Sequence, residues 1–325
     1  MRFITFHFTI IFLATSFLSF VVVNSCNANS FASDSTHKPH IHIIATGGTI
    51  AGAGSDSVES TYEAGKIGIG VLLKSLPGLG RVATLSSEQP VNIGSQEMDE
   101  TAFFLSLAVR CRKPIIMVGA VRPSSRMSAD GPLNLYNAVV AASDGRASQY
   151  GVSVVMNDLI FSAIDIEKTN TIAVDAFKAP NGAPYGYFSS GKLFLTQNLP
   201  LHHNLLGSFE LSNINKLPKV GIVYGYAGVD EAVVEGYIAA GYKGIVYAGV
   251  GDGNLSGKML NYLTSKIKNK IVVVRSSRVL SGGTMPDGEV DDTKYGFLVG
   301  GRLSPQKCRV LLMLSMACQQ PYLIL

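Results

Sequence analysis

A threonine in a glycine-rich loop is the clearest candidate for chemistry in this sequence. Thr49 lies in the run Thr-Gly-Gly-Thr-Ile-Ala-Gly at residues 46–52, directly after a strand-like apolar stretch at residues 40–45. Two adjacent glycines permit a sharp turn with backbone N–H groups facing an anion, which suits Thr49 as an alcohol nucleophile beside an oxyanion site. A dinucleotide-binding turn and a plain turn are the other interpretations. The first lacks the Gly-x-Gly-x-x-Gly spacing, and no Walker lysine follows.

Other polar groups follow later apolar stretches. Ser95 and Gln96 come after a strand-like stretch at residues 91–93, where a hydroxyl and an amide can bind a polar substrate. Lys168 opens the polar block Lys-Thr-Asn-Thr, although a lone lysine is by default a surface residue. An acidic run indicates a solvated face, because its spacing does not match a calcium-binding EF-hand loop. Its members are Asp287, Glu289, Asp291 and Asp292.

Histidine and cysteine usage excludes several kinds of catalytic site. The six histidines form no His-Glu-x-x-His motif, and the chain has no Gly-x-Ser-x-Gly motif, so metalloprotease and α/β-hydrolase readings are weak. The four cysteines show no Cys-x-x-Cys spacing, which argues against a zinc site or a disulfide scaffold. We therefore expect no metal, and a hydrolase here must activate its nucleophile without histidine.

Composition sets the broad class. The chain has 325 residues, of which 47% are hydrophobic and only 15% charged, so it can bury a large core and is not intrinsically disordered. Its formal net charge is +4, and no block of lysine or arginine stands out. We therefore expect no nucleic-acid partner.

The N-terminal segment has the pattern of a leader. Arg2 is the only charge before Asp34, and residues 8–23 are almost wholly apolar before small and polar residues follow. This pattern predicts a signal peptide at residues 1–28 and a secreted or periplasmic protein. The alternative is an uncleaved membrane anchor, since the apolar run is near the lower limit for a membrane span.

Alternating strand and helix patterns predict an α/β fold with two domains. The larger, at residues 39–200, has a parallel sheet covered by helices. A loose linker at 201–218 leads to a smaller α/β domain at 219–325. The expected strands are 40–45, 91–93, 115–118, 152–156, 220–224, 245–248 and 271–275. The expected helices are 67–76, 98–111, 230–240, 258–267 and an amphipathic helix at 305–317. A further helix is expected to begin at Pro132, with Asp130 as its cap.

Several motifs together resemble one known family. The run Ala-Thr-Gly-Gly-Thr-Ile-Ala-Gly at residues 45–52 is similar to the first signature of bacterial-type L-asparaginases and glutaminase-asparaginases. The resemblance also covers 91–96, 118–138, 168–171, 249–254 and 276–296, and it spans residues 41–312 in the family's order. It is strongest to the secreted type II enzymes. Such enzymes hydrolyse L-asparagine to L-aspartate and ammonia without a cofactor, and some of them also accept L-glutamine.

The resemblance assigns a role to each candidate residue. Thr49 matches the nucleophile, Tyr62 the flexible-loop tyrosine that assists it, and Lys168 the lysine of a second catalytic group. Ser95 and Gln96 match substrate contacts. Asn254 and Glu289 match residues lent by the neighbouring subunit, the first to substrate binding and the second to catalysis, which implies a homo-oligomer (a dimer or tetramer). A Tyr–Glu or Lys–Asp pair would then handle the threonine proton in place of histidine.

One family segment has no counterpart in this chain. The second signature, His-Gly-Thr-Asp-Thr, normally precedes a helix beginning Met-Glu-Glu-Thr-Ala, but here Ser95-Gln96-Glu97 leads directly into Met-Asp-Glu-Thr-Ala at 98–102. The missing segment has about 30 residues, the size of a strand–helix step. In the family, it carries the second catalytic threonine and the aspartate that binds the substrate amino group. The sequence therefore supports an asparaginase and, alternatively, a catalytically impaired isoform, gene model or ligand-binding relative. A third hypothesis, a dinucleotide-dependent oxidoreductase, is supported by the glycine loop alone.

Overall fold

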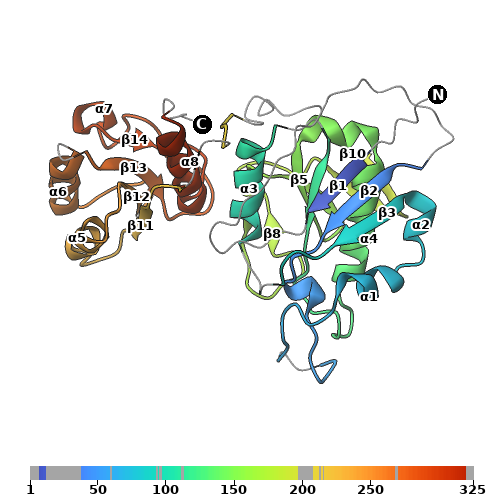
Figure 1. The fold of residues 1–325 in the computed structure, drawn as a ribbon. Coiled ribbons are helices and arrows are strands. Elements are labelled where there is room, and N and C mark those ends of the chain that lie inside the picture. Colours follow the sequence, from blue (N-terminus) through green and yellow to red (C-terminus); the bar gives the residue numbers. More distant parts are fainter. Residues whose placement is uncertain are drawn as a thin grey trace. The chain divides into compact units, whose positions relative to one another are not determined.

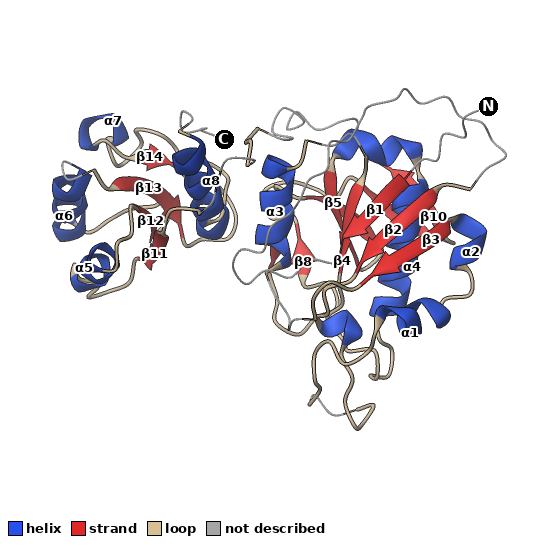
Figure 2. Ribbon diagram, in the orientation of Figure 1, coloured by secondary structure: helices blue, strands red, loops and turns tan. Residues whose placement is uncertain are grey.

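The computed structural model describes residues 7–11, 38–58, 61–92, 94, 97–110, 113–196, 208–211, 214, 216–267 and 270–319. The chain divides into two compact units, Met1–Ser208 and Phe209–Leu325. Each unit has its own β-sheet flanked by helices (Figures 1 and 2). The predicted fold class, an α/β protein with a larger N-terminal and a smaller C-terminal α/β part, is confirmed.

The first unit is built on an eight-stranded sheet with the order β10-β9-β6-β5-β4-β1-β2-β3. The strands from β5 to β3 in this order are parallel, whereas β6, β9 and β10 extend the sheet in antiparallel pairs. Their bounds are β1 His7–Ile11, β2 His40–Ile44, β3 Thr84–Glu88, β4 Ile115–Val118, β5 Val152–Met156, β6 Leu159–Ser162, β9 Gly186–Ser189 and β10 Lys192–Leu195. The antiparallel extension is absent from the sequence-based prediction.

Strand β1 occupies an inner position of this sheet. It pairs in parallel with β2 along its whole length, from His7 opposite His40 to Ile11 opposite Ile44. On its other side it pairs with β4, from Thr9 opposite Ile115 to Ile11 opposite Met117. Part of the segment that the sequence indicates as a leader, residues 1–28, therefore lies between β2 and β4 as a sheet strand.

Two helices cover opposite faces of the sheet. Helix α4 (Gly131–Ser143) packs on the face lined by Ile41 and Ile43 of β2 together with Ile116 and Val118 of β4. Helix α3 (Met98–Ala108) packs on the other face, whose core includes Ile115, Met117 and Val154. Side chains alternate between the two faces of a strand, so β4 contributes to both cores and is buried throughout.

One predicted strand is wrong. Val91 and Asn92 form loop, and residue 93 lies outside the described part. The edge strand is instead Thr84–Glu88, which pairs with β2 in parallel over its full length. Pro90, which has no N–H for a ladder, lies two residues after the end of this strand. The remaining short elements of the unit are α1 Ile69–Lys74, α2 Leu79–Val82, the 3₁₀ turns η1 Thr49–Ala51 and η2 Gly145–Tyr150, and the small pair β7 Glu167–Lys168 with β8 Phe177–Lys178.

The second unit has a four-stranded, wholly parallel sheet with the order β11-β12-β13-β14. Val223, Ile245 and Val273 form one core with α5 and α6, and α8 packs on the same sheet strands. Figure 2 shows α8 on the opposite side of these strands from α5 and α6. The bounds are β11 Val220–Tyr224, α5 Ala232–Ala239, β12 Gly244–Gly249, α6 Gly257–Ile267, β13 Val272–Ser277, α7 Asp292–Tyr295, β14 Leu298–Val299 and α8 Pro305–Cys318.

The last helix departs from the expected amphipathic pattern. Every residue of α8 from Val310 to Ser315 is buried, so the helix packs on more than one side rather than along a single apolar stripe. Among the described residues, no helix is both long and apolar enough to cross a membrane.

Candidate functional site

The Thr49 loop begins where strand β2 ends. Gly47 and Gly48 have φ values of 98° and 78°, a left-handed backbone that glycine adopts without strain. Thr49 then opens the short 3₁₀ turn η1, which is closed by hydrogen bonds from Ala51 N to Gly48 O (3.2 Å) and from Gly52 N to Thr49 O (2.9 Å). The chain thus leaves the sheet and turns back at once, which keeps the half-buried Thr49 next to the strand end.

Tyr62 is brought to Thr49 by the returning arm of the same loop. The Tyr62 hydroxyl lies 2.9 Å from Thr49 Oγ1, at hydrogen-bond distance. Next to Tyr62, Glu63 exchanges two backbone hydrogen bonds with Ala53, of 3.0 and 3.1 Å. The tyrosine ring packs against Gly52, where a Cβ atom would lie only 2.6 Å from Tyr62 Cδ2. A glycine at position 52 is therefore a steric condition for this pairing.

A second loop, between β4 and α4, supports the Thr49 turn from outside. Ser124 N donates to Gly52 O at 2.9 Å and Ser124 Oγ donates to Ile50 O, while Ser125 Oγ accepts from Gly54 N at 2.8 Å. These two serines belong to a stretch, residues 118–138, that the resemblance covers, but the sequence interpretation gave them no role. Their signal was the pair of adjacent hydroxyls after a buried strand.

Asp130 has a different part from the one expected. It is the N-cap residue of α4, as predicted, but its side chain does not cap that helix. Its carboxylate instead accepts hydrogen bonds from Val121 N (2.9 Å) and Arg122 N (2.8 Å). Asp130 thereby fixes the start of the loop whose serines support Thr49.

Lys168 lies on the short strand β7 of the first unit. It is exposed at the end of β7, its backbone N–H donates to Asp99 Oδ2 at 3.3 Å, and its ammonium lies over the Phe177 ring, 5.8 Å from the centroid. Within the described residues, its ammonium makes no ion pair with a carboxylate.

Asn254 and Glu289 are paired in the second unit. Asn254 Nδ2 donates to Glu289 Oε2, although the two residues lie on different loops, after β12 and β13. The other side-chain atom, Asn254 Oδ1, is buried and has no hydrogen-bond partner in the described part of the chain. Glu289 itself is exposed. This arrangement leaves the Glu289 carboxylate accessible at the surface of the second unit.

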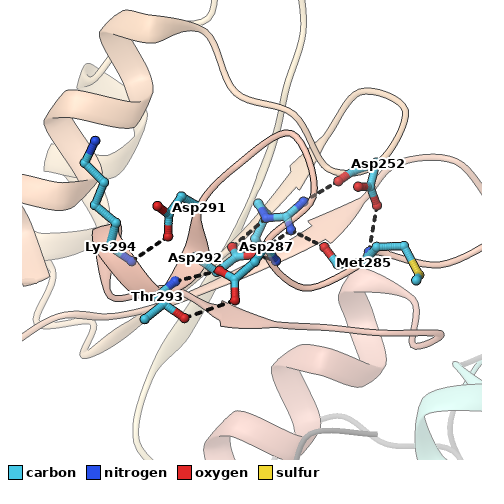
Figure 3. Close-up of polar contacts among 8 residues, drawn as sticks. Asp252, Met285, Asp287, Asp291, Asp292, Thr293 and Lys294 are labelled. Carbon is cyan, nitrogen blue, oxygen red and sulfur yellow. Dashed lines mark hydrogen bonds and ion pairs between the residues drawn. The ribbon is translucent and has the colours of Figure 1, made fainter.

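The acidic run is not simply a solvated face, which corrects the sequence-based expectation. Asp292 is only 3% exposed and bonds in a bidentate manner to Arg275, whose side chain is fully buried. Figure 3 shows Asp292 and Asp287 within this polar cluster. Asp287 is exposed, and hydrogen bonds from the Thr293 backbone N–H and hydroxyl lower the pKa of its carboxyl group.

The two predicted substrate contacts, Ser95 and Gln96, lie outside the described residues, so their contacts stay a prediction. In the described ranges, no group of three or more histidine, cysteine, aspartate or glutamate side chains is arranged to hold a metal ion.

Comparison with known proteins places the whole arrangement in a family. The model of the asparaginase N-terminal domain matches in two parts, residues 40–100 and 94–201, and that of the glutaminase/asparaginase C-terminal domain matches residues 219–322. L-asparaginase 2 of Escherichia coli is 45% identical over 309 residues, which covers 86% of this chain and 89% of the relative. A probable periplasmic L-asparaginase of Haemophilus influenzae is 43% identical, with coverage of 86% and 88%.

A solved structure agrees with these relatives. The crystal structure of a probable cytoplasmic L-asparaginase from Campylobacter jejuni superimposes with a TM-score of 0.80 at 36% identity, covering 86% of this chain and 95% of that one. The glycine-rich threonine loop, the two α/β units and both domain matches therefore lead to one conclusion: the chain belongs to the asparaginase family of amidohydrolases.

Proposed function

We propose that this chain is built to hydrolyse L-asparagine with Thr49 as the nucleophile, and that the chain as written does so poorly. The observation that supports the nucleophile is the 2.9 Å contact between Thr49 Oγ1 and the Tyr62 hydroxyl. A threonine hydroxyl is a weak nucleophile until a neighbouring group takes its proton. Tyr62 is within hydrogen-bond reach of that proton, as general-base catalysis requires.

The proposed chemistry proceeds in two steps. Thr49 Oγ attacks the side-chain carboxamide carbon of asparagine to form a tetrahedral intermediate. The Thr49 proton passes to the Tyr62 oxygen while the hydroxyl proton of Tyr62 passes on to a carboxylate, for which we propose Glu289 of a neighbouring subunit. The C–N bond then breaks, ammonia leaves with a proton, and aspartate remains bound as an ester of Thr49. Water next attacks the ester carbon, and the C–O bond to Thr49 breaks, which releases aspartate and restores the hydroxyl. No electron transfer and no cofactor are needed.

The setting of Lys168 supports the proposed impairment. In the resemblance, this lysine works with a threonine and lies near an aspartate that binds the substrate amino group, and both come from the segment with no counterpart here. The ammonium of Lys168 instead lies over Phe177. Because catalytic residues act as a unit, loss of one member costs up to about 10⁴–10⁶-fold in rate.

The form of the sequence match also supports a missing internal segment. The N-terminal domain model matches in two parts that overlap only at residues 94–100. The alignment to the E. coli relative has 309 positions but covers 86% of the 325-residue chain, about 280 residues, so about 30 positions have no counterpart here. Both observations fit a gap beside Gln96, where the sequence departs from the family pattern.

We further infer that the functional form is a homo-oligomer and that the protein is exported. Asn254 and Glu289 lie in the second unit and would complete a site that holds Thr49 in a neighbouring subunit. Export rests on residues 1–28. N-terminal sequencing of protein from its native host is expected to give a start between about Ser25 and Ser30 if a leader of ordinary length is removed; an intact Met1 contradicts this.

The decisive experiment compares two chains. One is the chain as written, and the other carries a family-derived segment inserted between Gln96 and Met98. Ammonia release from L-asparagine and L-glutamine is measured for both. We expect hydrolysis in the restored chain and a loss of about 10⁴-fold or more in the chain as written. Equal turnover of the two chains contradicts the impairment.

Variants of the restored chain separate the nucleophile from the scaffold. Thr49→Ala is expected to abolish ammonia release, and Lys168→Met is expected to reduce it strongly. In the chain as written, Lys168→Met is expected to have no effect on residual activity. Full activity of Thr49→Ala in the restored chain contradicts the assignment of the nucleophile, whatever the chain as written does.

A further inference from the structure

Arg275 is a buried residue of the second unit whose guanidinium bonds to several residues at once. It lies on β13, and its side chain is fully buried. Its guanidinium makes four hydrogen bonds: Nε to Asp292 Oδ1 (2.7 Å), Nη2 to Asp292 Oδ2 (2.6 Å) and to Met285 O (2.6 Å), and Nη1 to Asp252 O. Asp252 and Met285 accept through their backbone carbonyl oxygens, and Figure 3 labels both of them with Asp292 in this polar cluster.

These contacts bracket the two residues of the second unit that the proposed function uses. Asp252 precedes Asn254 by two residues on the loop after β12. Met285 and Asp292 lie on either side of Glu289, on the loop after β13. One guanidinium therefore holds the approach to Asn254 and both flanks of the Glu289 segment, and between them Asn254 Nδ2 donates to Glu289 Oε2.

Further contacts join the same two loops. Met285 N donates to Asp252 Oδ1 at 2.7 Å, and Asp287 N donates to Asp292 Oδ2 at 3.0 Å. The fit is close, because a Cβ atom at Gly288 would lie 2.9 Å from Asp252 Oδ2. The loops consequently have little room to shift independently while the Arg275–Asp292 pair is intact.

We propose that Arg275, with Asp292, is a positioning residue that keeps Asn254 and Glu289 in their paired geometry; this inference rests on the proposed function of those two residues. Arginine suits the role because its planar fork binds a carboxylate in a bidentate manner and still has donors for two carbonyl groups. Lysine keeps the charge but lacks the fork. Neither side chain of the pair reaches substrate in this role, because both are buried within the second unit.

The first test needs no turnover. In the full chain as written, labelled with ¹⁵N, the side-chain amide signals of Asn254 are assigned with Asn254→Ser. Asp292→Asn and Arg275→Lys are expected to move these signals in the direction given by Glu289→Gln, which removes the acceptor charge directly. Lys258→Met, which breaks the exposed ion pair between Lys258 Nζ and Glu231 Oε2 (2.6 Å) on the same unit, is expected to leave them unchanged.

The use of two variants keeps this test interpretable if one of them does not fold. Asp292→Asn retains the volume of the side chain, so it reports on positioning if Arg275→Lys does not fold. A folded Asp292→Asn protein, judged by circular dichroism and cooperative melting, with unchanged Asn254 signals overturns the proposal.

The second test uses a double-mutant cycle in the chain with the restored segment. Asp292→Asn and Glu289→Gln are each expected to lower kcat/KM by about 10²-fold, the cost of a misplaced group. The two variants should also divide this loss between kcat and KM in the same proportion. The double variant is expected to be no slower than Glu289→Gln alone, because Asp292 acts through Glu289. Multiplicative losses overturn the positioning role. If the restored chain releases no ammonia at all, the proposed function fails while the Asn254 signals still decide this inference.

Discussion

The Tyr62 hydroxyl and Thr49 Oγ1 lie 2.9 Å apart although the two residues are thirteen positions apart in the chain. Their contact depends on two features of the intervening loop. Gly52 gives the tyrosine ring a place to lie, and the paired backbone of Ala53 and Glu63 closes the loop beside it. The proposed nucleophile and the tyrosine proposed to take its proton are therefore placed by a single local structure.

Removal of the Tyr62 hydroxyl is expected to slow catalysis without loss of fold. In the chain with the restored segment, Tyr62→Phe should lower kcat by about 10²–10⁴-fold, the usual range for loss of a general acid–base group. Ammonia release measures it. Tyr187→Phe, at an exposed tyrosine of β9, is the matched control and should keep full activity. An active Tyr62→Phe protein is incompatible with the proton transfer proposed here.

Gly52→Ala tests the same pairing without changing either partner. Gly52 has an ordinary extended backbone (φ −80°, ψ 144°), so alanine is opposed by contacts rather than by φ. The closest contact of the added Cβ is the tyrosine ring at 2.6 Å, followed by Thr49 O at 3.0 Å. The ring must move, at an overpacking cost of about 1–3 kcal/mol, and turnover should fall with it.

The control for this substitution is Gly70→Ala in α1, where an added Cβ meets nothing within 4 Å. This variant should keep full turnover and change stability by no more than about 1 kcal/mol. If Gly52→Ala remains as active as Gly70→Ala, the ring position does not control the reaction.

Assembly is expected to depend on the loops that carry Asn254 and Glu289. Val250, Leu280 and Met285 are exposed apolar residues on these loops, at 42%, 45% and 65%, and clustered exposed apolar side chains mark interaction surfaces. Leu280→Glu should convert a dimer or tetramer to monomer in light scattering. Val233→Glu on α5 should not. A wild-type chain that is monomeric at all concentrations removes the basis for a shared site.

Asp287 is expected to make the second unit sensitive to acid. Its folded-state pKa lies below the ordinary value because Thr293 donates two hydrogen bonds to the carboxylate. The stabilisation is therefore complete above the unfolded-state pKa of about 3.9 and is lost as the pH falls through the lower folded-state value.

Asp287→Asn isolates this effect, since asparagine tolerates the left-handed φ of 51° at this position. Urea midpoints from pH 2.5 to 6 should show wild type more stable than the variant at the upper end, with the difference disappearing at the lower end. Asp175→Asn, at an exposed aspartate 3.1 Å from Lys178 Nζ, is the comparison. A difference that does not change with pH refutes the linkage.

Strand β1 is expected to contribute strongly to the stability of the first unit. A chain that begins at residue 29 lacks the partner of both β2 and β4, and it exposes two unpaired strand edges in the middle of the sheet. We expect a lower melting temperature and aggregation in size-exclusion chromatography, relative to the full chain, so the exported form proposed above is expected to be the less stable form of the chain as written. Equal melting and a single sharp peak for the shortened chain contradict this expectation.

Much of the fold could be predicted from periodicity. The buried strands at 115–118, 152–156 and 220–224 appear with those bounds, because continuous apolar runs between helical patterns are typical of inner parallel strands. The antiparallel β9 and β10 were missed because each has only four residues and polar positions on one side. The edge strand was missed because Thr84–Glu88 has a single apolar residue and is stabilised by its backbone pairing with β2.

The site was predictable only in part for a similar reason. Thr49 follows a strand and adjacent glycines, which is a local signal. Asp292, in contrast, looked like one of several solvated acids, since its partner Arg275 is seventeen residues away at the end of an apolar strand. The burial of a charge pair depends on tertiary structure, and no local spacing reports it.

The position of β1 makes the order of synthesis important for this chain. Residues 7–11 leave the ribosome first, their partner β2 follows at residue 40, and β4 is complete only at residue 118. The N-terminus is therefore synthesised well before the sheet can enclose β1 on both sides. Export through the proposed leader at residues 1–28 would remove this strand, whereas a chain that is not exported would keep it. The same five residues would then be part of the leader in exported chains and a strand of the sheet in chains that are not exported.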